Sequence, residues 1–380
     1  MATRESVTPT VAPSDLDAMD LSGRIPALRG RFDAIGIDAL VVSELKNVRY
    51  LTGFTGSSAV LVVRGDDAVF VTDGRYATQC ERQLGESGVV AQIEISKDSP
   101  EEVAAASAAS VARLGLEADS VTWSVQRRWA EELFGGELVP TTGVVEALRM
   151  VKDPGEVLRI RAACAVADEA LAEVSPRLLD GPTEREFALE LDAAMMRRGA
   201  DDVSFETIVA AGVNGALPHH RPTGAHISDG DLVVVDFGAL VDGYHSDMTR
   251  TFMVGDVGED RRRMFDVVAR AQAAGVDAVR AGAEVAQVDA ACRDVIAEAG
   301  WADAFVHGTG HGVGLDVHEA PRVSARVADT LHGGHVVTVE PGIYLPELGG
   351  VRIEDTVLVT RDGCERLTLA SKTPQVVSGR

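Results

Sequence analysis

Apolar and polar residues alternate along the first part of the chain in short segments typical of strands and helices. Segments rich in Val, Ile and Phe, which indicate strands, cover residues 38–43, 58–63, 68–72 and 89–95. Apolar residues at helical spacing predict helices over residues 75–84 and 101–114. Strands that alternate with helices in this way are typical of an α/β layered domain.

The rest of the chain combines pairs of helices with strands that carry acidic residues. Helical spacing covers residues 156–174, 183–198, 261–281 and 285–300, and strand-like segments cover residues 232–238, 244–254, 336–340 and 351–360. This order predicts an α+β domain with an antiparallel sheet, and it is compatible with an internal duplication that leaves no clear residue-level repeat. Pro and Gly between residues 140 and 155 indicate a boundary. We therefore expect domains over residues 16–145 and 146–380, after a segment 1–15 without fixed structure.

Composition narrows the classes of partner. The 380 residues include 36 basic and 59 acidic side chains, for a formal charge of −23. Nucleic acid and anionic lipid need clustered Lys and Arg, so neither is expected as a partner. The four cysteines lie far apart, and no long apolar run or secretory signal pattern occurs. These features predict reduced thiols and a cytoplasmic location.

The candidate chemistry lies in the second domain. All nine histidines fall between residues 219 and 335, beside a predicted hairpin over residues 232–252 that carries Asp236 and Asp247. If residues 240 and 243 close the turn, Asp236 lies opposite Asp247. If residues 241 and 244 close it, Asp236 faces Thr249 and Asp247 is its diagonal neighbour. Both registers place the two carboxylates on one face, about 5–8 Å apart. A three-residue loop would instead place them on opposite faces unless a bulge intervened.

A carboxylate among apolar strand residues is costly to bury without a cation. Asp236 alone is equally compatible with a turn cap or an ion pair with Arg250. Two further apolar strands each carry an acid, Glu340 and Glu354, and a Gly-rich loop over residues 307–321 carries three histidines. Four carboxylates and a loop imidazole exceed what one structural zinc takes and suit a pair of divalent ions that activate a water for hydrolysis.

In their order and spacing these residues resemble the dinuclear metallopeptidases of the pita-bread fold, which include methionine aminopeptidase, aminopeptidase P and prolidase. The motifs PHHRPTG, HGTGHGVGLDVHE, EPGIY and VRIED are similar to the proline-directed branch, and residues 1–140 resemble its creatinase-like N-terminal domain. The resemblance implies an α+β protein: a C-terminal pita-bread domain preceded by a smaller α/β domain.

The resemblance also implies a role for each matching residue. The implied metal ligands are Asp236, Asp247, His311, Glu340 and Glu354, with Asp247 and Glu354 bridging two ions. Catalytic roles fall on His219, His318 and Glu340, the last as proton acceptor, and supporting or substrate-side roles on His307 and Arg352. The remaining histidines are expected to be surface, turn or supporting residues: His220, His226, His245, His332 and His335.

The expected function is hydrolysis of the bond between an N-terminal residue and proline. We take Xaa-Pro aminopeptidase as the first expectation and Xaa-Pro dipeptidase, or prolidase, as the alternative, because no residue decides between them. A metal-free creatinase-like hydrolase and a non-catalytic interaction module are weaker alternatives, since the ligand set is intact. The resemblance further implies two divalent ions per subunit, Mn(II) before Co(II) or Zn(II), peptide substrates with proline at position two, and a homodimer.

Overall fold

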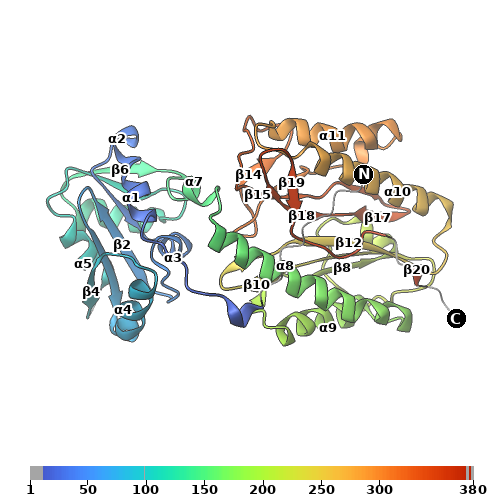
Figure 1. The fold of residues 1–380 in the computed structure, drawn as a ribbon, viewed down its shortest axis with the longest axis horizontal. Helices are drawn as coiled ribbons and strands as arrows, with labels where there is room; N and C mark the ends of the chain where they lie inside the picture. Colours follow the sequence, from blue (N-terminus) through green and yellow to red (C-terminus); the bar gives the residue numbers. More distant parts are fainter. Residues whose placement is uncertain (1–11, 98, 374–375, 378–380) are drawn as a thin grey trace. The chain divides into compact units, whose positions relative to one another are not determined.

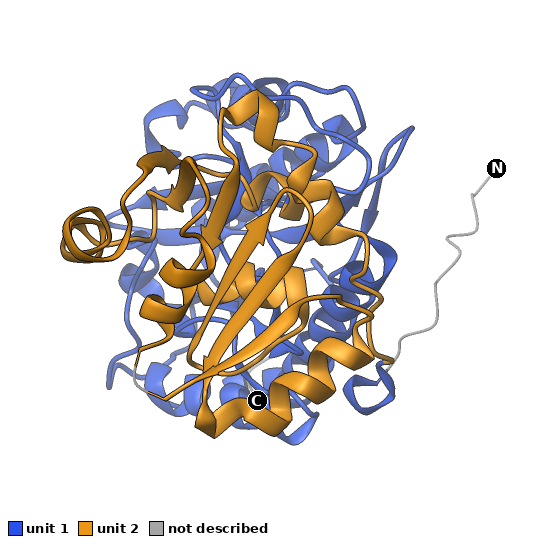
Figure 2. Cartoon of the chain, turned by 90° about the vertical axis from the view of Figure 1, so that its left-hand side faces the viewer, with its two compact units in different colours: residues 1–16, 150–380 blue, residues 17–149 orange. Residues whose placement is uncertain are grey.

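The computed structural model describes residues 12–97, 99–373 and 376–377. The chain forms two compact units, one of residues 17–149 and one of residues 150–380 together with the start of the chain (Figure 1, Figure 2). Most of the segment expected to lack structure lies outside the described residues; of the rest, Pro13–Asp15 forms a 3-10 turn. In the described part of the chain, no helix has the length and apolar character needed to cross a bilayer.

The N-terminal unit, residues 17–149, is built on a mixed six-stranded sheet of order β4-β3-β2-β1-β5-β6. Its strands are β1 (Ala39–Val42), β2 (Ala59–Arg64), β3 (Ala68–Asp73), β4 (Gln92–Ser96), β5 (Arg113–Glu117) and β6 (Glu137–Thr141). Its helices are α1 (Arg24–Arg29), α2 (Phe32–Ile35), α3 (Leu45–Thr52), α4 (Ala77–Glu86), α5 (Pro100–Ser107), α6 (Trp123–Arg128) and α7 (Glu146–Arg149).

One predicted helix in this unit is wrong in its second half. The helix expected over residues 101–114 ends at Ser107, whose hydroxyl donates to the Val103 carbonyl. Residues 113–117 instead form β5, which pairs in parallel with β1 and with β6. Leu114 and Leu116 pack in the core of the unit. Pairing with two neighbouring strands therefore overrides the helical spacing of this alanine-rich segment.

The C-terminal unit, residues 150–380, has a sheet layer between two pairs of helices. Figure 1 shows α8 and α9 on one side of the strands and α10 and α11 on the other. These helices are α8 (Pro154–Val174), α9 (Glu184–Arg197), α10 (Gly258–Ala278) and α11 (Val285–Glu298). The strands that matter for the site are β8 (Ile208–Ala211), β9 (Leu232–Phe237), β10 (Ala239–Val241), β11 (Tyr244–His245), β12 (Met248–Val254), β13 (Gly310–Gly312), β14 (Glu319–Val323), β15 (Val336–Val339), β16 (Gly342–Leu345), β17 (Gly349–Arg352) and β18 (Asp355–Val359).

The remaining strands of this unit are short: β7 (Asp202–Val203), β19 (Cys364–Arg366) and β20 (Val376–Val377). Pairing in this unit is antiparallel except between β12 and β20. The predicted α+β domain with an antiparallel sheet is thus confirmed.

Two separate hydrophobic cores lie in this unit, and β9 contributes to both. Val233, Val235 and Phe237 pack with α8 and α9, whereas Leu232 packs with α10 and α11. Successive side chains of a strand point to opposite faces. Asp236 therefore shares the face of Leu232, on the side of α10 and α11, and lies beyond the apolar part of that core.

The hairpin takes the second of the two predicted registers. Val241 pairs with Tyr244 across the turn, and Asp236 pairs with Thr249. The turn needs a left-handed backbone at both central positions, which Asp242 and Gly243 adopt with φ of 45° and 75°. Asp247 consequently lies diagonally across from Asp236 on the same face.

Candidate metal centre

The predicted site residues line one cavity of about 520 Å³ in the C-terminal unit. The walls come from four places in the chain: the hairpin, the segment before β9, the Gly-rich loop, and the strands β15 to β18. The cavity contains every residue assigned to the site from sequence: His219, Asp236, Asp247, His307, His311, His318, Glu340, Arg352 and Glu354.

The strands bring the four carboxylates together at a common point. Asp236 is near the end of β9 and Asp247 directly precedes β12, while Glu340 follows β15 and Glu354 lies between β17 and β18. Ligating atoms of Asp236, Asp247 and Glu354 lie within 4.8 Å of one another, as do those of His311, Glu340 and Glu354. Glu354 belongs to both groups, so the arrangement can hold two ions that share a carboxylate.

Two carboxylate oxygens in this cluster have no partner. Among the described residues, Asp236 Oδ1 and Glu354 Oε1 are buried without a hydrogen bond. Their second oxygens are bound: Asp236 Oδ2 accepts from Arg352 at 2.6 Å, and Glu354 Oε2 accepts from the Thr249 hydroxyl at 2.7 Å. A buried anionic oxygen left unpaired is costly. The oxygens that remain free are therefore suited to a cation that the protein itself does not supply.

The pKa shifts reflect the same crowding. Burial raises the pKa of Asp236, and burial together with the charges of Glu354 and Asp236 raises the pKa of Asp247 well above its ordinary value. The pKa of Glu354 is raised in the same way, by burial and by the charge of Glu340. Repulsion between adjacent carboxylates favours protonation until an opposite charge balances it. A pair of divalent ions would offset four carboxylate charges.

His311 presents a nitrogen suited to a metal. Its Nδ1 lies 3.0 Å from the Gly312 carbonyl oxygen, which can only accept, so Nδ1 carries the proton. Nε2 is then available and lies 3.3 Å from Glu340 Oε1 and 3.5 Å from Asp247 Oδ2. An imidazole held by a backbone carbonyl through its other nitrogen is the usual arrangement of a ligating histidine.

The residues present thus fit a two-metal site, because they combine orphaned oxygens, a free imidazole nitrogen and a surplus of buried negative charge. The Thr338 hydroxyl donates to Glu340 Oε1 at 3.3 Å and accepts from the His311 backbone N–H at 3.1 Å, so it links these two residues. His318 could be a further metal ligand, because its ligating atom and those of Asp247 and His311 lie within 4.8 Å of one another. From sequence, His318 was expected to have a catalytic role and was not predicted as a metal ligand.

A hydrogen-bonded chain extends from the carboxylates to His307. Arg352 donates to Asp236 and, at 2.8 Å, to the hydroxyl of Tyr344, which lies 2.9 Å from His307 Nε2. His307 Nδ1 faces the Gly308 carbonyl at 2.8 Å and so carries the proton. Tyr344 must therefore donate to Nε2. Burial lowers the pKa of His307, which keeps it in this neutral form.

The other histidines divide between the cavity and the fold. His219 is exposed into the cavity, whereas His220 is buried with Nε2 2.9 Å from Glu184 Oε2. His226 contacts the Gly181 carbonyl, and His245 contacts the Ser204 hydroxyl. His332 and His335 face each other across a turn, with ring centroids 5.3 Å apart. None of these last four lines the cavity.

Three further residues at the site were not singled out from sequence. Thr249 and Tyr344 hold Glu354 and His307, and Arg322 lines the cavity from β14. Tyr344 lies within the EPGIY motif, and Thr249 follows from the hairpin register, so both carried a signal. Arg322 follows His318 by four residues in an exposed strand position, which by itself resembles any surface arginine.

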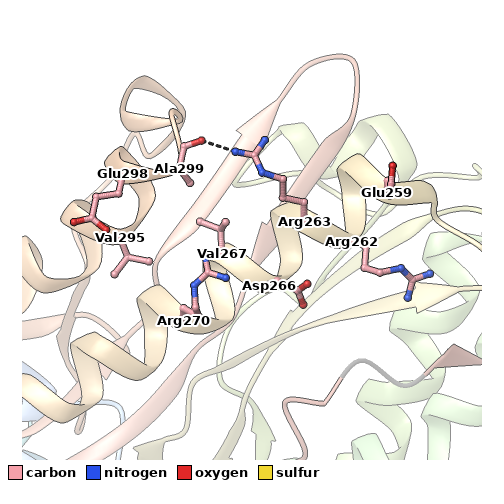
Figure 3. A pocket seen from close by; sticks show the side chains of 9 residues that line it. All are labelled: Glu259, Arg262, Arg263, Asp266, Val267, Arg270, Val295, Glu298 and Ala299. Carbon is pink, nitrogen blue, oxygen red and sulfur yellow. Dashed lines mark hydrogen bonds between the residues drawn. The ribbon is translucent and has the colours of Figure 1, made fainter.

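A second cavity, of about 620 Å³, lies between α10 and α11 (Figure 3). Charged residues of both signs line it together with Val267, Val295 and Ala299, and Arg263 donates to the Ala299 carbonyl at 2.8 Å. It contains no histidine and none of the clustered carboxylates. Although this cavity is larger, the groups that can perform chemistry lie in the first one.

Comparison with known proteins gives two family matches. Residues 159–361 match the model of metallopeptidase family M24, and residues 24–151 match the creatinase/prolidase N-terminal domain. The Xaa-Pro dipeptidase of Pyrococcus furiosus is 36% identical over 91% of this chain and 97% of its own length.

Two solved structures extend the similarity to the fold. The Xaa-Pro dipeptidase from Bacillus anthracis superposes with a TM-score of 0.91 at 37% identity, covering 94% of this chain and 99% of that one. The X-Pro aminopeptidase from Thermotoga maritima gives a TM-score of 0.84 at 32% identity, covering 90% of this chain and 99% of that one. The pita-bread architecture with a creatinase-like N-terminal domain, expected from sequence, is confirmed by these matches.

Proposed function

The chain belongs to metallopeptidase family M24, and from this we propose that it uses two divalent metal ions to hydrolyse the bond between a first residue and a proline. The dipeptide Xaa-Pro is the proposed preferred substrate. Asp236, Asp247, His311, Glu340 and Glu354 are the proposed ligands. The relatives named Xaa-Pro dipeptidase and X-Pro aminopeptidase support a peptidase of the Xaa-Pro type.

One observation carries the two-metal part of the proposal. Four carboxylates and an imidazole converge in one cavity, and two of the carboxylate oxygens are buried without a partner. A metal-free hydrolase would leave these oxygens unsatisfied, and an interaction module would have no use for them. Both weaker alternatives from the sequence therefore lose support.

A bound pair of divalent ions supplies a water of lowered pKa and polarises the scissile carbonyl. The protein residues do the rest. Glu340 is the proposed proton acceptor, and the Thr338 hydroxyl positions it by donating to Oε1 at 3.3 Å. Burial opposes ionisation of Glu340, but its polar and charged neighbours outweigh burial and lower its pKa to about 2. His219 and His318 face the cavity, where a neutral imidazole can donate a hydrogen bond to the carbonyl oxygen as it gains charge.

Arg322 supports the preference for dipeptides. It lines the cavity, and among the described residues its guanidinium has no ion-pair partner. Arg322 shares the lining of this cavity with His318 and His311. A fixed positive charge next to the reacting centre suits the free carboxylate of a C-terminal proline. A longer peptide has an amide there and would not use this charge.

The test compares Ala-Pro with Ala-Pro-Ala, assayed with Mn(II) and after chelation. We expect metal-dependent cleavage with a higher kcat/KM for the dipeptide. In Arg322→Ala the KM for Ala-Pro should rise about 10- to 100-fold, the range for a lost charge-assisted hydrogen bond. Arg326→Ala is the matched control, because that arginine is exposed on the same segment but does not line the cavity.

Faster cleavage of the tripeptide than of the dipeptide would establish the aminopeptidase that the sequence favoured. Full activity in a protein freed of metal would refute the two-metal site. Mn(II) as the native metal, the homodimer and the cytoplasmic location stay predictions, which metal analysis of protein purified without chelator, light scattering and cell fractionation would decide.

A further inference from the structure

A second buried carboxylate, Glu184, lies outside the cavity at the first position of α9. Its side chain is completely buried. It is preceded by Thr183, the N-cap of α9, which forms a capping box with Glu186. The Glu184 carboxylate accepts from none of the N–H groups at this helix end, because its hydrogen bonds all come from residues 211–223. Capping of the helix therefore does not explain this acid.

Five donors surround the Glu184 carboxylate, and all belong to residues 211–223. Oε1 accepts from the Ala211 N–H and the Asn214 amide, both at 2.9 Å. Oε2 accepts from the Thr223 N–H at 2.9 Å, the Thr223 hydroxyl at 2.6 Å and His220 Nε2 at 2.9 Å. A carboxylate has about four lone-pair sites, so this one is saturated and has no capacity left for a metal or a substrate.

The segment that Glu184 binds forms one wall of the cavity. It begins at the end of β8 and contains the turn in which the His220 N–H donates to the Leu217 carbonyl at 3.1 Å. His219 projects from this turn into the cavity, while His220 turns inward to Glu184. The two adjacent histidines therefore have different tasks, one at the reaction and one at the anchor.

His219 is placed among the other cavity histidines. It lines the same cavity as His307 and His318. No hydrogen bond of the His219 side chain itself is seen among the described residues. Its position depends on the backbone of the turn, and the turn depends on Glu184.

We propose that Glu184 is a positioning residue, which holds residues 211–223 so that His219 faces the scissile bond. This inference rests on the proposed function of the cavity. Glu184 touches neither substrate nor metal and acts only through the turn. Its replacement should therefore move His219 without removing any candidate ligand.

The first variant is Glu184→Gln. The glutamine side chain has one oxygen and one NH2 group where glutamate has two oxygens. The NH2 group cannot accept a hydrogen bond, so the contacts on its side are lost: either those to Ala211 and Asn214 or those to Thr223 and His220. We expect kcat/KM to fall about 10- to 100-fold, as for other residues that orient a catalytic group, with metal content unchanged. Asn214→Ala removes a single donor and serves as the milder variant, with a smaller loss in the same direction.

A double-mutant cycle with His219→Ala separates positioning from a general effect on the fold. If Glu184 acts through His219, Glu184→Gln should reduce kcat/KM less than about twofold further in the His219→Ala background. Equal losses in both backgrounds would overturn the positioning role. Glu186→Gln is the matched control: it alters the same helix end but should leave kcat/KM unchanged.

Hydrogen exchange followed by mass spectrometry gives a readout independent of activity. In Glu184→Gln, exchange should speed up in peptides covering residues 211–223 and stay unchanged in β9 and β12. Unchanged exchange in that segment would overturn the anchor. A wild-type protein that cleaves no Xaa-Pro substrate would refute the proposed function and the catalytic role of His219, while the exchange result would still decide whether Glu184 holds the segment.

Discussion

The C-terminal unit buries carboxylates in two regions by opposite means. Glu184 is surrounded by five donors, which lower its pKa to about 2 although burial alone would raise it. In the cavity, Asp236 and Glu354 each keep one buried oxygen without a partner, and their pKa values are raised. In the roles proposed above, the saturated acid anchors a segment of the fold, whereas the unsaturated acids bind metal.

A third arrangement lies between these two. Glu319, next to His318, forms an ion pair at 2.5 Å with Lys152, whose side chain is fully buried. Here the protein supplies the cation itself. The three cases indicate that the partner of a buried carboxylate, and not its burial, distinguishes an anchor from a binding site.

The largest effect is expected from a substitution of Asp247, one of the carboxylates proposed to bind metal. Asp247→Asn should lower kcat/KM by more than about 100-fold. Replacing a residue that only orients a metal ligand already lowers metal affinity or activity by up to about 100-fold, and a ligand itself should matter more. The same change should make the metal-free protein more stable, because it removes one of several repelling charges. Thermal unfolding in chelator measures the second effect. Retained turnover, or a less stable metal-free variant, would contradict the assignment.

Breaking the protein-supplied ion pair should have the largest effect on folding. Lys152→Met leaves Glu319 buried without its cation, and such a loss costs about 3–5 kcal/mol of unfolding free energy. Urea unfolding at neutral pH measures it. Because both side chains are removed together in Lys152→Met/Glu319→Leu, that double variant should recover much of the loss; failure to recover would indicate that packing, not charge, is responsible.

Glu184 should contribute stability that depends on pH in a defined window. Its folded pKa of about 2 lies below the ordinary 4.5, so its contribution is present above pH 4.5 and is lost as the pH falls towards 2. The shift corresponds to about 3 kcal/mol at neutral pH. Glu184→Gln should therefore be less stable than the wild type at pH 7 and approach it at acid pH. A difference that does not change with pH would be inconsistent with a charged Glu184.

The smallest expected effect is that of the metal on the wild-type protein. An ion that binds only the folded chain adds about 2.7 kcal/mol at a hundredfold excess over its Kd. The melting temperature should rise with Mn(II) and fall on chelation, and Asp247→Asn should respond much less. An equal rise in both proteins would mean that the ions bind elsewhere.

Local patterns in the sequence were sufficient to predict which carboxylates lie together in the candidate site. The apolar strand and the turn near Gly243 predicted two registers that place Asp236 and Asp247 on one face, and the structure has the second of them. Glu340 and Glu354 were recognised because each is an acid within an otherwise apolar strand-like segment. Sequence order and spacing then matched these residues to a known family.

Long-range contacts could not be predicted in this way. Glu184 binds Ala211 and Thr223, which are 27 and 39 residues away, so the sequence predicted only the helix over residues 183–198 in which it lies. The strand β5 was hidden because its neighbours β1 and β6 are distant in sequence and a helix fits the local pattern equally well. Arg322 could not be singled out from sequence because its proposed role depends on its position in the lining of the cavity.

The unpaired oxygens of Asp236 and Glu354 have a consequence for the abundance of this protein in the cell. Without metal, the repelling carboxylates raise the unfolded fraction, and a change of only about 1–2 kcal/mol can alter the abundance of a protein several-fold through degradation. Metal supply would then set not only how active each molecule is but how many molecules survive. Starvation for divalent ions should lower the amount of the wild-type chain, and Asp247→Asn should be spared.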